Sequence, residues 1–197
     1  MSRALPDCDD LFLRFFDPWY DDDSRQQRGF KATYPDVLQD GSLIGLTQAE
    51  ASCVTEEGQH EILRQIDDMV EAARHDWPSY LSVTDDIALT WIDAFDKHYE
   101  RKRIREVIEH SDPSNFSNDY VVLCCEFGAA LSYVLLAAQP RLVWRLDWPY
   151  WDSLLVDPKT GNAISVFHWA IKKMSEYGVE DGFAAKTTAC LQLLEEE

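Results

Sequence analysis

The sequence has little positive charge. Over 197 residues, 18 lysines and arginines stand against 36 aspartates and glutamates, which gives a formal net charge of −18. Such a chain repels polyanions such as DNA, and its average field attracts basic proteins. We therefore expect a protein as the partner and no nucleic acid; the alternative is that the negative charge serves solubility alone.

Motifs that carry chemistry are also missing. The chain has no phosphate-binding glycine loop, no G-x-S-x-G sequence and no H-E-x-x-H sequence. Its histidines lack metal-binding spacing, and the E-x-x-H at 57–60 is a pattern that arises often by chance. The sequence thus predicts no catalytic residue, no metal and no cofactor.

Paired cysteines and an export signal are absent as well. The five cysteines are odd in number and form no C-x-x-C sequence, a pattern typical of reduced thiols. Residues 1–17 lack the cationic start and uninterrupted apolar run of a signal peptide. These features favour a cytoplasmic protein.

The chain divides into two parts. Residues 1–45 show no sustained period and predict an irregular N-terminal extension packed on the domain, with a short helix near 9–16. Residues 46–197 predict a single domain. A short strand is expected at 42–47, where this domain begins. Apolar spacings of three and four predict a helix from Glu56 to the region of Pro78. A second helix, capped by Thr84, is expected to continue to about His110.

The longest apolar stretch lies at 120–138. Its length suits a membrane span, but Glu126 lies inside it and its flanks carry no strong basic anchor. We therefore expect no membrane association, and a helix at the centre of the domain that its neighbours cover on all sides. Gly128 and the two alanines after it would let another element approach closely.

Beyond Pro140 the period of the apolar residues becomes two. This pattern and the turn "PKTG" predict a three-stranded antiparallel meander. A helix ending at Gly178 and a last amphipathic helix follow. The predicted fold class is α+β, with helices packed on one face of a small antiparallel sheet, the C-terminal meander, around the central apolar helix.

One short stretch, "DWPYWD" at 147–152, concentrates rings and carboxylates, and related stretches occur at 17–23 and 75–80. Trp and Tyr are enriched at interface hot spots, and the surrounding carboxylates favour a cationic partner. The alternative is that the rings cap the edge of the core. The candidate partner-binding residues are Asp17, Trp19, Tyr20, Asp21, Asp147, Trp148, Tyr150, Trp151 and Asp152.

Glu126 is the candidate buried polar residue. Inside an apolar helix its carboxyl group must find a partner or remain protonated, and we favour a structural bond to the sheet or to Arg145. The alternative is a catalytic carboxylate pair with Asp147 or Asp152. A basic run at 97–105 indicates a solvated face, and a phosphate or nucleic-acid groove is the alternative.

Residues 118–194 resemble a group of bacterial α+β domains. The resemblance rests on "EFGAAL", "RLVWRLDW" and "NAISVFHWAIKKMSEYG". In size and acidity the chain is similar to cytosolic immunity proteins, which bind and block toxins from competing bacteria. This likeness implies an inhibitor that neutralises a basic toxin domain, and it carries over no catalytic residue. The alternatives are a hydrolase or carbohydrate-binding enzyme with a Trp/Tyr platform, and a DNA-mimic protein.

Overall fold

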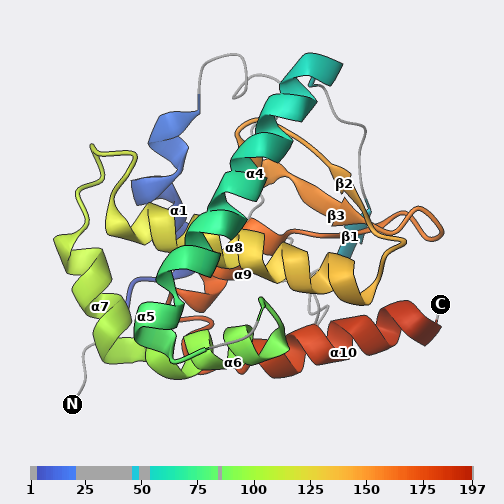
Figure 1. Ribbon diagram of the computed structural model, residues 1–197. Coiled ribbons are helices and arrows are strands. Elements are labelled where there is room, and N and C mark those ends of the chain that lie inside the picture. Colours follow the sequence, from blue (N-terminus) through green and yellow to red (C-terminus); the bar gives the residue numbers. More distant parts are fainter. Residues whose placement is uncertain (1–3, 21–45, 49–53, 84–85, 197) are drawn as a thin grey trace.

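The computed structural model describes residues 4–20, 46–48, 54–83 and 86–196, and it has the predicted α+β architecture (Figure 1). Its helices are α1 (Cys8–Phe15), α4 (Glu56–Asp76), α5 (Pro78–Leu81), α6 (Leu89–His98), α7 (Arg101–His110), α8 (Asp119–Ala138), α9 (Val166–Lys173) and α10 (Phe183–Glu196). Its strands are β1 (Leu46–Gln48), β2 (Val143–Arg145), β3 (Leu154–Val156) and β4 (Asn162–Ile164), and its short 3₁₀ helices are η1 (Asp17–Trp19) and η2 (Tyr150–Asp152).

Helix α8 is the centre of the fold, as its composition predicts. Thirteen of its residues are buried, and they include residues on all sides of the helix. Helix α4 crosses it on one side and α9 packs along it on the other (Figure 1). Within the described part of the chain, α8 alone is long and apolar enough to cross a membrane, and 67% of that stretch is buried by its neighbours.

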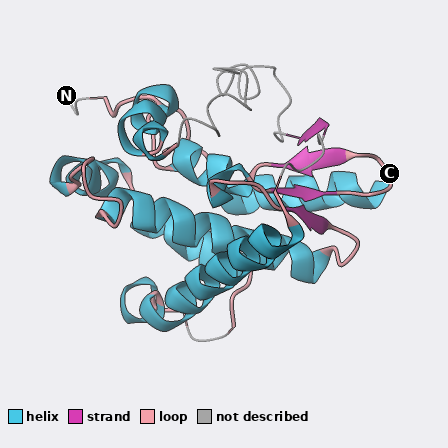
Figure 2. Cartoon of the chain, turned by 90° about the horizontal axis from the view of Figure 1, so that it is seen from above, coloured by secondary structure: helices cyan, strands magenta, loops and turns pink. Residues whose placement is uncertain are grey.

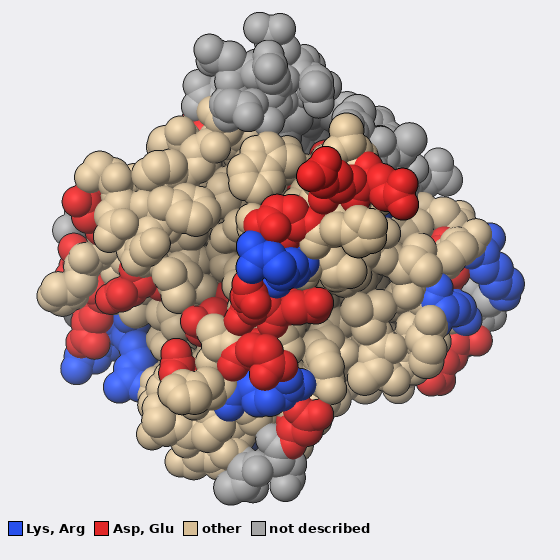
Figure 3. Space-filling model, turned by 45° about the horizontal axis from the view of Figure 1, so that its top comes forward, with Lys and Arg blue, Asp and Glu red and all other residues tan. Residues whose placement is uncertain are grey.

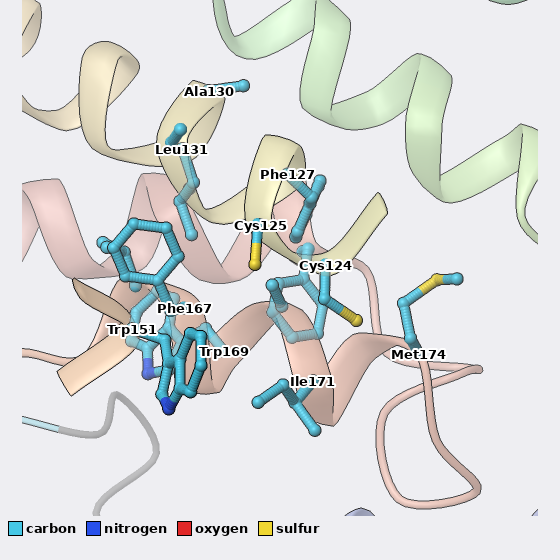
Figure 4. Close-up of a cluster of buried hydrophobic side chains, with 14 of the residues drawn as sticks. Cys124, Cys125, Phe127, Ala130, Leu131, Trp151, Phe167, Trp169, Ile171 and Met174 are labelled. Carbon is cyan, nitrogen blue, oxygen red and sulfur yellow. The ribbon is translucent and has the colours of Figure 1, made fainter. Parts of the chain in front are cut away.

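Gly128 sets the distance between α8 and α9. A Cβ atom at Gly128 would lie 2.5 Å from Cδ1 of Phe167 and 3.0 Å from its Cα. Only glycine leaves room for this approach, which confirms the expectation for this position. The side chains of Cys125 and Leu131 point toward the aromatic side chains of α9, whereas Ala130 points away from them (Figure 4).

Helix α4 follows its predicted bounds. The hydroxyl of Thr55 accepts a hydrogen bond from the backbone N–H of Gly58 and caps the first turn. One stripe of the helix is buried, and it consists of Ile62, Ile66, Val70 and Ala73. The helix ends at Asp76, and Pro78 opens the short helix α5 in the next turn, where a missing N–H costs nothing.

The helix predicted between Thr84 and His110 is instead two helices, α6 and α7. Thr84 lies outside the described residues, and α6 begins at Leu89. The chain leaves helical geometry at Tyr99, whose ring is buried 4.4 Å from the ring of Phe95. This break turns α7, which then buries Ile104 and Ile108 against the core. Both helices carry apolar residues at helical spacings, so the sequence pattern led us to expect one continuous helix.

The predicted meander is present, and β1 adds a fourth strand to it. This strand overlaps the end of the short strand expected at 42–47, of which residues 42–45 lie outside the described residues. The strand order is β1-β4-β3-β2, and every neighbouring pair is antiparallel. Gly161 has a φ of +75° in the turn between β3 and β4, a conformation that favours glycine. Viewed from above, the sheet lies at one side of the helices (Figure 2).

Helix α9 ends at Lys173, five residues before the predicted stop at Gly178. Gly178 lies against the backbone of α9, where an added Cβ would come within 2.3 Å of the carbonyl oxygen of Lys172. The glycine is needed for this close approach and not as a helix cap. Near the same end, the buried Lys173 ammonium forms an ion pair of 3.0 Å with Asp96 and ties α9 to α6.

Residues 4–20 pack against the core through one set of buried side chains. Helix α1 buries Leu11, Phe12 and Phe15, and the backbone N–H of Leu5 donates to the carboxylate of Glu176 over 2.7 Å. The predicted short helix near 9–16 is thus confirmed. Residues 21–45, most of the predicted extension, lie outside the described residues.

The contact at Gly128 predicts a large effect of a small substitution. Gly128→Ala should lower the free energy of unfolding by about 1–3 kcal/mol, because the new methyl group overpacks against Phe167. The matched control is Gly182→Ala, whose methyl group would meet its nearest neighbour at an ordinary 3.7 Å. Urea unfolding measures both variants. Equal unfolding midpoints for the two would contradict the close helix contact.

Candidate functional site

Two of the three aromatic and acidic stretches meet in space. Tyr20, at the end of η1, donates its hydroxyl hydrogen to Oδ1 of Asp152 in η2 over 2.9 Å. The indole N–H of Trp151 donates to the same hydroxyl over 2.8 Å. A hydrogen-bonded chain of three side chains therefore joins segments more than 130 residues apart, and all three are buried.

Helix α9 supplies a fourth member of this network. Nε2 of His168, in the first turns of α9, lies 3.5 Å from Oδ1 of Asp152. The ring of Phe12 meets the His168 ring edge-on, with 6.1 Å between the centroids. The carboxylate of Asp152 thus has polar partners from two elements in a site that is nearly closed to solvent. Since buried carboxylates need such partners, this network fixes η2 against the end of η1 and against α9.

The loop before η2 displays one ring outward. Trp148 is 45% exposed, and a cis peptide bond joins it to Pro149. The backbone N–H of Asp147 donates to the hydroxyl of Ser153, and the side chain of Asp147 forms an ion pair of 3.2 Å with Arg145. Short-range bonds therefore hold the loop, and the Trp148 ring projects from a fixed base.

The structure divides the candidate partner-binding residues by exposure. Trp148 is exposed, while Asp17, Trp19 and Asp147 are partly exposed. Burial corrects the expectation for four others, because a side chain inside the core offers no contact area: they are Tyr20, Tyr150, Trp151 and Asp152. These four residues instead match the alternative interpretation, in which they cap the edge of the core, and they support the surface from beneath. Asp21 lies outside the described residues.

The third stretch, at 75–80, supplies the hydrogen-bond partner of Glu126. The indole N–H of Trp77 donates to Oε2 of Glu126 over 3.0 Å, and both side chains are buried. Burial raises the pKa of Glu126, the hydrogen bond from Trp77 lowers it, and the nearby Asp76 raises it. Glu126 is therefore a buried polar residue, as expected. Its partner is an indole of the α4–α5 junction instead of the sheet or Arg145.

The contacts of the acidic candidates differ. Glu126 bonds Trp77, whereas Asp152 bonds Tyr20 and Asp147 pairs with Arg145. On α8 the preceding residue, Cys125, accepts a hydrogen bond from the hydroxyl of Tyr150 near η2. Because adjacent helical residues point about 100° apart, Glu126 is turned away from that side. These contacts do not assemble the carboxylate pair that hydrolysis by Glu126 requires.

Other reactive groups have structural surroundings. Four cysteines are buried and free of disulfides in the described part of the chain, Cys8, Cys124, Cys125 and Cys190. Burial raises the pKa of each thiol, which disfavours the nucleophilic thiolate. Cys53 lies outside the described residues. The described residues also contain no group of three or more His, Cys, Asp or Glu side chains that could hold a metal ion.

The basic run at 97–105 forms local bonds. Lys97 pairs with Asp93, and Lys102 lies 3.7 Å from Glu106. Arg101 forms ion pairs with Glu176 and with Glu180, which are far away in the sequence. Such pairing fits a solvated face and helps to hold α7 on the fold.

Two features of the surface escaped the sequence reasoning. Phe116, in the loop before α8, is 37% exposed and lies with its ring centroid 5.2 Å from that of Trp19. The outer face of α4 carries a dense series of acids, and a line of acidic groups interrupted by basic ones crosses the face of the molecule in Figure 3. The acids occupy the positions of α4 that alternate in the sequence with its apolar stripe, and this pattern could have revealed the acidic face. A single phenylalanine gave no comparable signal.

No protein-family model, curated protein or solved structure matches the chain.

The buried carboxyl group of Glu126 predicts a pH-dependent stability difference. A raised pKa in the folded state contributes stability at acid pH that is lost as the pH rises through that pKa. Glu126→Gln keeps an acceptor for Trp77 and removes the titration. The free energy of unfolding of this variant relative to wild type should therefore increase between about pH 4 and pH 7. Urea unfolding at several pH values measures it.

An exposed glutamate of α4 is the control with the opposite sign. Hydrogen bonds from Arg64 hold the pKa of Glu61 below its usual value, so its contribution is present at neutral pH and lost on acidification. Glu61→Gln should then lose stability relative to wild type as the pH rises. A Glu126→Gln difference that stays constant over this range would contradict the assigned burial of the charge.

Proposed function

We propose that this chain is a non-enzymatic binding protein of the bacterial cytoplasm, an immunity-type inhibitor that holds a basic toxin domain on its acidic surface. The observation that carries the proposal is the outer face of α4. A helix with this charge pattern is a ready surface for a cationic partner, because opposite charges steer the encounter of two proteins.

The acidic face of α4 is dense. Its seven exposed acids are Glu56, Glu57, Glu61, Asp67, Asp68, Glu71 and Asp76, and its two arginines are Arg64 and Arg74. Arg64 pairs with Glu61 and Asp68, so each cation is already engaged. Burial raises the pKa of Asp67, and the charges of Asp68 and Glu71 raise it further. This mutual repulsion of the carboxylates would be relieved by cations of a partner.

Much of the positive charge in the described ranges is already paired with acids. In the described ranges, nine lysines and arginines take part in ion pairs with acids, namely Arg64, Arg74, Lys97, Arg101, Lys102, Arg141, Arg145, Lys173 and Lys186. With a net charge of −18, the excess acids remain to set the field that a partner meets.

An exposed ring precedes an element that packs on α4. Helix α4 packs beside η2, and the loop that leads into η2 carries the exposed Trp148. The surface therefore offers both acidic groups and a rigidly based indole, which suits a partner that carries basic residues and an apolar pocket. Exposed charges would act mainly on association and the indole mainly on dissociation.

The alternatives gain no comparable support. A hydrolase would need its carboxylates in one site, and Glu126 and Asp152 have separate partners. A DNA mimic would present unbroken negative charge, whereas two arginines interrupt the face of α4. The binding test distinguishes both of these functions from the proposed inhibition of a toxin.

The binding test uses the protein encoded beside this chain in the native genome, since an inhibitor is expected beside its toxin. Neutralising Glu56, Glu57 and Asp67 together, as Gln, Gln and Asn, should slow association by about tenfold at low salt and leave dissociation nearly unchanged. Trp148→Ala should instead accelerate dissociation, with a loss of about 2 kcal/mol in binding free energy. Surface plasmon resonance in a salt series separates the two effects.

The matched control is Glu195→Gln, an exposed acid on α10. This variant should change the association and dissociation rates by no more than the loss of one charge from the whole protein does. Association that is independent of salt, or a neighbouring protein that binds without loss of its toxic activity, would contradict the proposed inhibition by an acidic surface.

A further inference from the structure

Two rings form an exposed aromatic surface between the N-terminal segment and the loop before α8. Trp19 and Phe116 meet edge-to-face, with 5.2 Å between centroids and 78° between planes. Phe116 is 37% exposed, Trp19 is partly exposed, and Pro18 beside it is exposed. We refer to Trp19 and Phe116 as the aromatic platform. In Figure 1, the loop before α8 lies beside α1, which brings the two rings together.

The aromatic platform is held from below by the core. The ring of Phe116 lies 5.9 Å from that of Trp151, which is only 2% exposed. Trp151 is fixed in turn by its hydrogen bond to the Tyr20 hydroxyl. A ring whose support is already ordered loses little conformational freedom when a partner covers it. The platform therefore has the rigidity of an interface anchor.

Acidic residues lie close to the two rings in the sequence. Asp17 is two residues from Trp19, and Asp112 and Asp119 are within four residues of Phe116. The backbone N–H and hydroxyl of Ser114 donate to Asp112 and lower its pKa, so this carboxyl group is ionised at neutral pH. The nearest cation in the sequence, Arg14, lies over the ring of Phe15, 4.7 Å from its centroid.

We propose that the aromatic platform is a docking site for an arginine- or lysine-bearing segment of the basic partner. Charge complementarity selects this occupant, because the residues that neighbour the two rings in the sequence include the acids Asp17, Asp112 and Asp119. A guanidinium or ammonium group can lie over an aromatic ring while its N–H groups reach the neighbouring aspartates. The inference rests on the proposed function and locates its partner contact at residues outside the α4 face.

A hexa-arginine amide peptide is the probe, and the full chain labelled with nitrogen-15 is the target. The indole N–H resonance of Trp19 should shift on titration at low salt. Phe116→Ala should weaken peptide binding by about 5-fold, the size of an exposed cation–π contact together with lost ring area. Asp112→Asn with Asp119→Asn should weaken it as well, and this exposed pair tests the site if Phe116→Ala reduces folding.

Two control variants locate the effect. Tyr177→Ala removes another exposed ring, one that already has the ammonium of Lys172 4.0 Å from its centroid, and should leave the affinity unchanged. Glu56→Gln with Glu57→Gln reports on the α4 face. Peptide binding that shifts α4 resonances and is unchanged in both platform variants would overturn the platform and leave the acidic binding protein standing. An absence of peptide binding at low salt would count against both proposals.

Discussion

The fold depends on the need to cover α8 from every side. The helix has no polar face that could lie against water, and its two buried polar side chains within the middle turns, Glu126 and Ser132, both form hydrogen bonds. The hydroxyl of Ser132 donates to the carbonyl of Ala129 over 2.7 Å, and Glu126 accepts from Trp77. Because apolar surface gains free energy when it is removed from water, the other helices are arranged as the cover of this one.

This arrangement also positions the candidate surfaces. Helix α9 reaches its place because Gly128 allows it, and α9 then presents His168 to Asp152. Asp152 and Trp151 bind Tyr20, so the N-terminal segment is tied to the same core. Buried members of the aromatic stretches thus order the structure, while Trp148 and Phe116 remain at the surface. The acids of α4 lie on the side of that helix opposite its buried stripe, since its periodicity separates the two.

Much of the fold could be predicted because periodicity reports burial directly. The helix that starts at Glu56, the central helix and the meander all follow from spacings of three and four or of two. The break at Tyr99 was not predicted, because Lys102 and Arg103 at the next positions of the stripe suit a solvated face, and only the tertiary packing of the Tyr99 ring shows the turn. The early end of α9 was missed for a related reason. Gly178 serves a close backbone approach, which a sequence does not distinguish from a helix cap.

The candidate site was harder to predict than the fold. Tryptophan and tyrosine suit both a core edge and an interface, so composition alone did not separate the buried Trp151 from the exposed Trp148. The importance of "DWPYWD" was recognised, whereas its direct contact with the stretch around Tyr20 needed the fold. The partner of Glu126 was also set by tertiary structure, since Trp77 is 49 residues away in the chain.

Native-state hydrogen exchange tests the central role of α8 most directly. If the other helices exist as its cover, the amides in the middle of α8, from Cys125 to Leu135, should exchange only through global unfolding. Their exchange free energies should then equal the free energy of unfolding from urea denaturation, and the α9 amides that face Gly128 should follow them. Exchange of these α8 amides through local openings far below the global free energy, with α4 or α9 better protected, would contradict this account.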